Sequence, residues 1–180
     1  WCFVDWLLPD ISGIEMCRRL RETPATRYAH ITMVLDEDDS DAKKRALRSG
    51  ADDYLLGPAD ADRLATRLQQ YRRSKGTVPP ATRLKSGELQ VDLAAVLVRY
   101  RDRRVTLAPN EFKLLAHFVE NPDRVWSRTS LIEILGKDDA SIDERTVDVW
   151  IGRLRRALKA QDVPDRLRTV RAMGYVFDGF

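Results

Sequence analysis

The stretch Ser141–Lys159, SIDERTVDVWIGRLRRALK, decides the fold of the second half of this chain. On a helix with about 3.6 residues per turn, one stripe is aliphatic and consists of Val147, Ile151, Leu154 and Leu158. The opposite side holds Arg145, Val149, Gly152, Arg153 and Arg156. A helix with these two faces suits the major groove of DNA. The alternative is an ordinary surface helix, whose acids lie early and bases late as the helix dipole favours.

The elements around this helix indicate a winged helix-turn-helix. Short apolar runs predict antiparallel strands at 89–91, 96–98 and 105–107. Pro109 opens one helix and Ser127 caps a second. Residues 167–177 contain Gly174 and predict a closing hairpin. A β-meander, three helices and a hairpin, in this order, give an α+β domain with a winged helix.

The pattern of the first half predicts an α/β domain with a parallel sheet. Unbroken apolar runs predict strands at 1–4, 31–35 and 54–56, alternating with helices at 13–22, 41–49 and 61–71. Asp5 then stands at the carboxyl end of a strand, where such folds place their ligand sites. The first strand is apolar on both faces and belongs inside a sheet. We therefore expect that elements preceding Trp1 are missing from this sequence.

A linker separates the two halves. Residues 72–87, RRSKGTVPPATRLKSG, lack apolar periodicity and contain Pro79-Pro80. The predicted domains are therefore 1–73 and 88–180, joined by 74–87. Residues 1–82 hold 13 basic and 13 acidic side chains, whereas residues 83–180 hold 18 and 15. The positive excess lies in the second half, which favours a polyanionic partner there.

Composition and motifs exclude several other classes of protein. No apolar run is long enough to cross a bilayer and no signal-peptide pattern appears, so we expect a cytoplasmic protein without a membrane partner. Cys2 and Cys17 have no metal-ligand spacing and are interpreted as reduced thiols. The sequence has neither a glycine-rich phosphate loop nor a nucleophile elbow. We expect no enzymatic activity, no bound metal and no certain cofactor.

The segments VDWLLPDISGIEMCRRLR and GADDYLLGPAD resemble the receiver domain of two-component response regulators. The resemblance covers strand three to helix five of this flavodoxin-like fold. It implies that Asp5 is the phosphoacceptor for a sensor histidine kinase. The family's switch Ser or Thr and its Lys are replaced by Leu35 and Gly57, which predicts weak or absent phospho-switching. The alternative is a conventional kinase-controlled regulator with an unusual site.

Two further expectations come from this resemblance. Mg²⁺ would bind only if the missing acidic pair of the family exists in the full protein. Asp53 and Arg67 match a charge pair of the family's dimer face, which implies a homodimer.

The segments LAPNEFKLLAHFVENPDRVWSR, DERTVDVWIGRLRRAL and TVRAMGYVF resemble the OmpR/PhoB-type effector domain. The resemblance places Thr146, Val149, Trp150 and Arg153 at base edges. It places Arg128, Arg145 and Arg156 at phosphates, and Thr169 and Arg171 on the wing at the minor groove. Arg155 is interpreted as a solvated flank, and Ala172 replaces a glycine at the wing turn.

Taken together, these patterns predict a sequence-specific DNA-binding transcription regulator of the two-component family. Its partners would be double-stranded promoter DNA and a second copy of the chain. RNA polymerase, through residues 136–143, and a sensor histidine kinase are further candidate partners. The alternative from another class is a protein-interaction adaptor.

Overall fold

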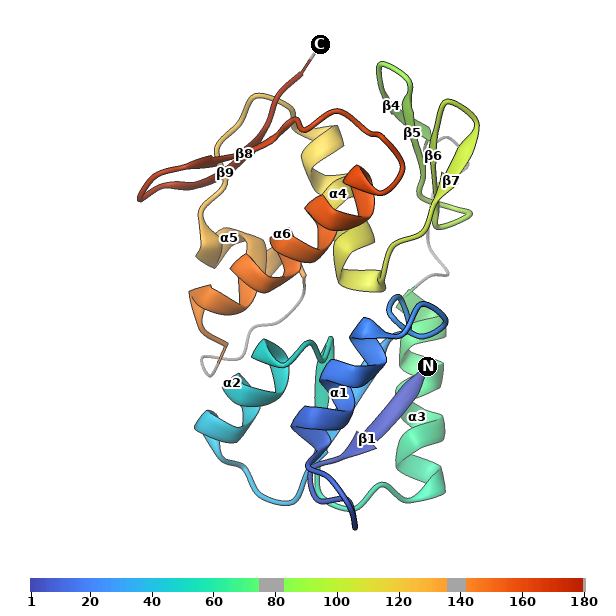
Figure 1. Cartoon of the computed structure of the whole chain (residues 1–180), viewed down its shortest axis with the longest axis vertical. Helices are drawn as coiled ribbons and strands as arrows, with labels where there is room; N and C mark the ends of the chain where they lie inside the picture. The colour runs from blue at the N-terminus through green and yellow to red at the C-terminus, as the bar shows by residue number, and fades with distance from the viewer. Residues whose placement is uncertain (75–82, 136–141, 180) are drawn as a thin grey trace. The chain divides into compact units, whose positions relative to one another are not determined.

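The computed structural model describes residues 1–74, 83–135 and 142–179 (Figure 1). The chain divides into two compact units, Trp1–Thr82 and Arg83–Phe180. This division agrees with the two halves that differ in pattern and charge.

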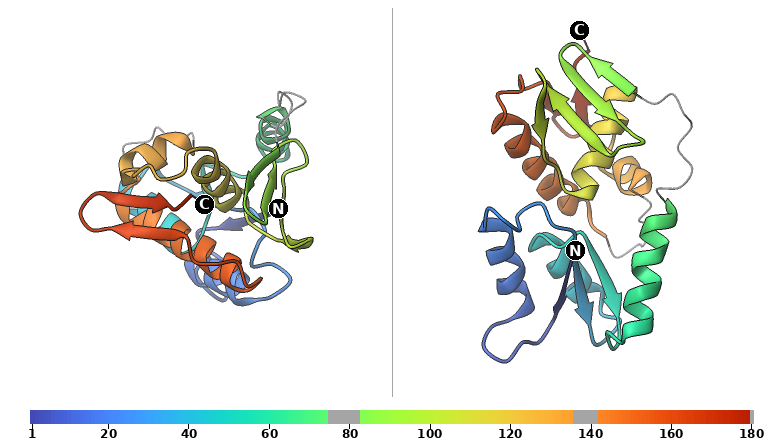
Figure 2. Two further views of the ribbon diagram at one scale, coloured as in Figure 1. Left: turned by 90° about the horizontal axis from the view of Figure 1, so that it is seen from above. Right: turned by 90° about the vertical axis from the view of Figure 1, so that its right-hand side faces the viewer.

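The first unit is a parallel sheet covered by helices on both faces. Its strands β1 (Cys2–Asp5), β2 (Ile31–Leu35) and β3 (Asp53–Leu56) pair in the order β1-β2-β3. Helices α1 (Gly13–Glu22) and α2 (Ser40–Arg48) lie on one face and α3 (Ala61–Ser74) lies on the other (Figure 2). The predicted β-α alternation and parallel pairing are confirmed.

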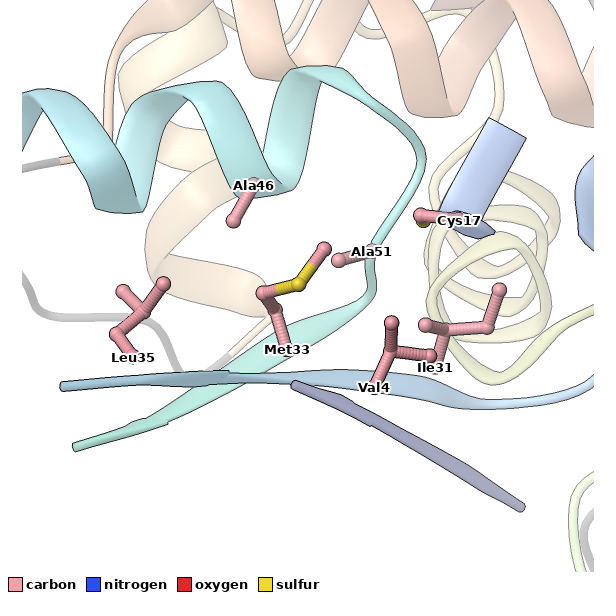
Figure 3. Close-up of a cluster of buried hydrophobic side chains, with 7 residues drawn as sticks. All are labelled: Val4, Cys17, Ile31, Met33, Leu35, Ala46 and Ala51. Carbon is pink, nitrogen blue, oxygen red and sulfur yellow. The ribbon is translucent and has the colours of Figure 1, made fainter. Parts of the chain in front are cut away.

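Strand β2 is buried along its whole length because helices cover both of its faces. The core between the sheet and helices α1 and α2 is apolar (Figure 3). It contains Val4, Cys17, Ile31, Met33, Leu35, Ala46 and Ala51. Gly13 begins α1 beside β1, where an added Cβ would lie 2.1 Å from the carbonyl oxygen of Asp5. Only glycine therefore allows this close approach of helix and strand.

In residues 83–135 and 142–179, the second unit contains two antiparallel sheets and three helices. The first sheet has the order β4 (Arg83–Ser86), β5 (Leu89–Asp92), β6 (Leu97–Tyr100) and β7 (Arg103–Val105). Helices α4 (Pro109–Glu120), α5 (Arg128–Ile134) and α6 (Glu144–Lys159) follow, and strands β8 (Leu167–Val170) and β9 (Gly174–Phe177) form the wing. This arrangement confirms the predicted winged helix.

Two local predictions about helix starts are confirmed, and one about the linker is wrong. The Ser127 hydroxyl accepts a hydrogen bond from the Ser130 N–H at 3.1 Å, and Pro109 opens α4. The predicted linker 74–87 contains β4, which pairs with β5 along its full length. Only every second residue of β4 is exposed, so the strand is amphipathic. Because one of its faces is polar, the sequence lacks the apolar run that predicts a strand and predicts a linker instead. Within the described residues, no helix is long and apolar enough to cross a membrane.

Candidate nucleic-acid interface

Helix α6 has a defined start and two unequal faces. The Asp143 carboxylate caps it by accepting the Arg145 N–H at 2.8 Å. The buried residues are Thr146, Val147, Trp150, Ile151, Arg153, Leu154, Ala157 and Leu158. Arg145 and Arg156 are exposed, and Val149 and Gly152 are partly exposed between them. The exposed side is therefore narrower than the helical pattern alone predicted.

Arg153 does not lie on that exposed side. Its side chain is 8% exposed, and its Nε lies 2.6 Å from the Glu111 carboxylate, which is itself 2% exposed. The same carboxylate accepts the Ala108 N–H at 2.8 Å and so caps α4. The prediction that Arg153 reaches a base edge is therefore wrong. Arg153 neutralises a buried acid and attaches α6 to α4.

Thr146 and Trp150 are also buried, both with 0% exposure. Helix α6 packs against α4 on one side and α5 on the other, so its buried arc is wider than a single aliphatic stripe. The prediction that these two side chains contact bases is wrong for this reason. A helical pattern locates the centre of a buried face, whereas its width depends on how many neighbours cover it.

A hydrogen-bonded cluster joins α5, α6 and the wing. The Arg128 Nε donates to the Asp148 carboxylate at 2.7 Å, and one of its terminal nitrogens donates to the Tyr175 hydroxyl at 3.3 Å. The Tyr175 hydroxyl donates to the same carboxylate at 2.5 Å. Burial, and secondarily the carboxylate of Asp148, raise the pKa of Tyr175. Arg128 was predicted to contact phosphate, and here its guanidinium is held by an acid.

Arg155 connects the recognition helix to the wing. Its guanidinium donates to the Leu167 carbonyl at 2.6 and 3.0 Å and to the Thr169 hydroxyl at 2.9 Å. It also lies over the Tyr175 ring, 5.6 Å from the centroid. The interpretation of Arg155 as a solvated flank is wrong. Sequence reasoning missed this role because the partners are more than ten residues away along the chain.

The wing turn keeps a left-handed residue without glycine. Ala172 has a φ of 62°, and the Met173 N–H donates to the Val170 carbonyl at 3.1 Å to close the turn. Gly174 is enclosed, because an added Cβ would lie 2.0 Å from the Trp126 carbonyl oxygen. Arg171 is exposed and the Met173 side chain is 60% exposed at the tip. Ala172 therefore preserves the turn, with some backbone strain.

The receiver unit presents a much poorer site. Asp5 is exposed at the end of β1, while the Leu35 side chain is 1% exposed and points into the apolar core (Figure 3). Gly57 has a φ of 77°, and an added Cβ there would lie 2.9 Å from a guanidinium nitrogen of Arg63. That guanidinium donates to the carbonyls of Leu56 at 2.5 Å and Pro58 at 3.3 Å.

The described part of the chain contains no group of three or more His, Cys, Asp or Glu that could hold a metal ion. Asp53 is partly buried, and its carboxylate accepts the Tyr54 N–H at 2.9 Å. The side chain of Arg67 and the loop 136–141 lie outside the described residues.

Family models match both units. Residues 1–69 match the response regulator receiver domain, and residues 102–177 match the C-terminal domain of transcriptional regulatory proteins. The chain is thus a two-component response regulator with a DNA-binding domain.

Similar proteins show which type of response regulator this chain is. The phosphate regulon transcriptional regulatory protein PhoB of Rhizobium meliloti is 42% identical over 173 residues, which are 96% of this chain and 76% of that protein. AfsQ1, a transcriptional regulatory protein of Streptomyces coelicolor, is 34% identical over 178 residues, covering 97% of this chain and 76% of that protein. The chain therefore belongs to the PhoB/OmpR-type transcription regulators. A structure of a RitR mutant shares the fold with a TM-score of 0.60 at 21% identity, covering 99% of this chain and 78% of that chain.

Proposed function

We propose that this regulator binds promoter DNA with α6 in the major groove and the wing in the minor groove. The observation that supports this proposal is a set of exposed or partly exposed groups on two elements that part-buried hydrogen bonds hold together. Arg145, Val149 and Arg156 project from α6, and Arg171 projects from the wing tip. Arg155 and the Tyr175 cluster fix the wing to the helix, so both elements can meet one duplex without reorganising.

The proposed roles follow from charge and exposure. Arg145 and Arg156 are suited to phosphates, which position the domain without reading sequence. Val149 is suited to a thymine methyl group. Arg171 is suited to a narrow minor groove, and Thr169 lies two residues earlier on the same hairpin. Arg128 already donates to the Asp148 carboxylate, which offsets part of its positive charge, so its contribution to phosphate binding should be smaller.

The wing assignment can be tested with two arginines of the same hairpin. Arg171→Ala should weaken binding to a duplex selected from a random pool by about 1–2 kcal/mol and lower the salt slope by about one. Arg168→Ala is the matched control, because its guanidinium is held by the Asp178 carboxylate at 2.5 and 2.6 Å. Equal losses for both variants, measured by fluorescence anisotropy over a range of salt, would show that the wing has no specific contact.

We further propose that the receiver does not act as an efficient phospho-switch. A phosphoryl group on Asp5 needs nearby cations and hydrogen-bond donors. The Leu35 side chain offers no donor and is packed in the core, and Gly57 carries no ammonium group. The competing function is conventional kinase control through Asp5. A phosphodonor assay with Mg²⁺ on the full-length protein separates the two, since rapid and stable labelling of Asp5 would overturn the proposal.

Three partner and location assignments complete the proposal. The protein would act in the cytoplasm and bind as a homodimer on direct repeats, which analytical ultracentrifugation with one-site and two-site duplexes can test. A contact with RNA polymerase would involve residues 136–143. An adaptor that binds only proteins is the remaining alternative. A salt-independent or absent DNA affinity would favour it over the DNA-binding proposal.

A further inference from the structure

Helices α1 and α2 border a hollow that the DNA-binding function does not use. Its volume is about 420 Å³. Helices α1 and α2, which lie on the same face of the sheet, are labelled in Figure 1. The residues that line it are Ser12, Ile14, Arg18, Arg45, Arg48 and Ser49. Three of these six carry a guanidinium group, and none is acidic. The hollow is separate from Asp5, Leu35 and Gly57, none of which lines it.

Four other basic side chains on the same two helices have acidic partners. The nitrogens of these side chains lie close to carboxylates: Arg19 to Glu15 at 2.9 Å, Arg21 to Asp52 at 2.6 Å, Lys43 to Asp38 at 2.5 Å, and Lys44 to Asp41 at 3.6 Å. Within the described part of the chain, Arg18 and Arg45 have no such carboxylate. Arg45 lies over the Trp6 ring, 5.3 Å from its centroid. Local charge pairing therefore leaves the positive charges of Arg18 and Arg45 at the hollow without a neighbouring carboxylate among the described residues.

The helix dipole explains only part of this cluster. Arg45 and Arg48 are in the last turn of α2, where a cation is favourable beside the free carbonyl groups. Arg18 is in the middle of α1, so the dipole gives no reason for a cation there. Arg18 and Arg45 are exposed, so water and salt weaken the repulsion between their guanidinium groups. An anion bound between them would offset the repulsion that remains.

We propose that this hollow binds a small phosphate-bearing molecule. Guanidinium groups bind phosphate oxygens through paired, charge-assisted hydrogen bonds, and Arg18 and Arg45 would supply them from opposite walls. The Ser12 hydroxyl oxygen accepts the Glu15 N–H at 3.2 Å, which leaves its own hydrogen available for a phosphate oxygen. The volume is within the usual range of small-molecule sites, about 300–1,000 Å³. The proposal does not depend on DNA binding.

Titration calorimetry of the full chain with pyrophosphate tests the site. The double variant Arg18→Ala with Arg45→Ala should weaken binding by about tenfold or more, because two charge-assisted contacts are lost. Arg19→Ala is the matched control. It removes one charge from the same helix, but that guanidinium is 60% exposed and occupied by Glu15. The dissociation constant of the Arg19→Ala variant for pyrophosphate should stay within roughly twofold of the parent value.

Other outcomes would overturn the proposal. Equal weakening by Arg19→Ala and by the double variant would show diffuse attraction to a basic surface. Absence of saturable pyrophosphate binding would rule out the site, and binding of an acidic peptide without pyrophosphate would assign the surface to a protein partner. If the alanine double variant melts at a lower temperature, Arg18→Gln with Arg45→Gln gives the same comparison. Binding of the selected DNA duplex, measured in parallel, reports on the DNA-binding function separately.

Discussion

The wing and the end of the receiver sheet both depart from the pattern that their families imply, and the consequences differ. At the wing, Ala172 replaces a glycine, yet the turn keeps its left-handed geometry and Arg171 stays exposed. At the receiver, Leu35 and Gly57 replace groups that carry hydrogen-bond donors, and the new side chain is packed into the core. A change in backbone preference is absorbed at a modest energetic cost. The second change instead removes polar groups, and the proposed loss of phospho-switching rests on it.

A related contrast separates Arg153 from Arg171. Both are arginines in segments that resemble DNA-contacting elements, but one is 8% exposed in an ion pair and the other lies at an exposed tip. The first should therefore contribute to stability and the second to DNA affinity. Variants at these positions and at the two altered sites test both contrasts.

The largest effect is expected from Arg153→Ala. This change leaves the Glu111 carboxylate buried without its cation, and the free energy of unfolding should fall by about 3–5 kcal/mol. Urea denaturation measures the loss. Arg156→Ala, on the exposed side one turn later, should change it by less than about 0.5 kcal/mol. Pairing Arg153→Met with Glu111→Gln should recover much of the loss, since glutamine still caps α4; no recovery would contradict the ion-pair explanation.

Placing a hydroxyl at position 35, where the receiver family has Ser or Thr, should destabilise the protein. Leu35→Thr removes apolar volume from a closed core and buries a hydroxyl, which should reduce the free energy of unfolding by about 2–3 kcal/mol. Leu7→Thr is the control, because Leu7 is 70% exposed and should tolerate the change. A Leu35→Thr variant as stable as the parent, in the same urea series, would mean that the position has room to present a polar switch.

The wing turn should respond in the opposite direction. Ala172→Gly relieves a φ of 62° and should stabilise the protein by about 0.5–1 kcal/mol in thermal unfolding. Ala95→Gly, in the exposed turn before β6 and without a positive φ, should be neutral or destabilising. If both glycines destabilise the protein equally, strain at Ala172 is not stored in the folded state.

The smallest expected effect is on the pH dependence of protein stability. His117 packs edge-on to the Trp126 ring at 4.2 Å, and burial, the largest influence, lowers its pKa, against the nearby Glu120 and together with Arg124. The unfolded chain therefore binds a proton more readily than the folded one as pH falls through about 6.5. The packing of the neutral His117 side chain therefore contributes its full stability above that pH, and this contribution is lost as the pH falls below it. His117→Phe should flatten the dependence, and an unchanged acid profile would contradict this assignment.

The sequence predicted some features well because they depend on local chemistry. Unbroken apolar runs located β2, and the Ser127 hydroxyl and Pro109 marked helix starts. The errors arose where tertiary packing decides. Strand β4 has one polar face, so its sequence predicts a linker. Trp150 is predicted to contact bases but is buried, because a second helix covers its side of α6. The acidic partner of Arg153 is more than forty residues away along the chain, which no helical pattern reveals.

Gly152 has a consequence for how such a regulator could change its targets. An added Cβ at this position on the outer side of α6 would meet nothing within 4 Å, although the neighbouring turns are packed against the domain. Side chains other than that of proline should therefore be accepted there, and alanine would favour the helix by about 1 kcal/mol over glycine. A single codon change at this site could add a new base-reading group without repacking the protein, so DNA preference can diverge while the scaffold stays constant.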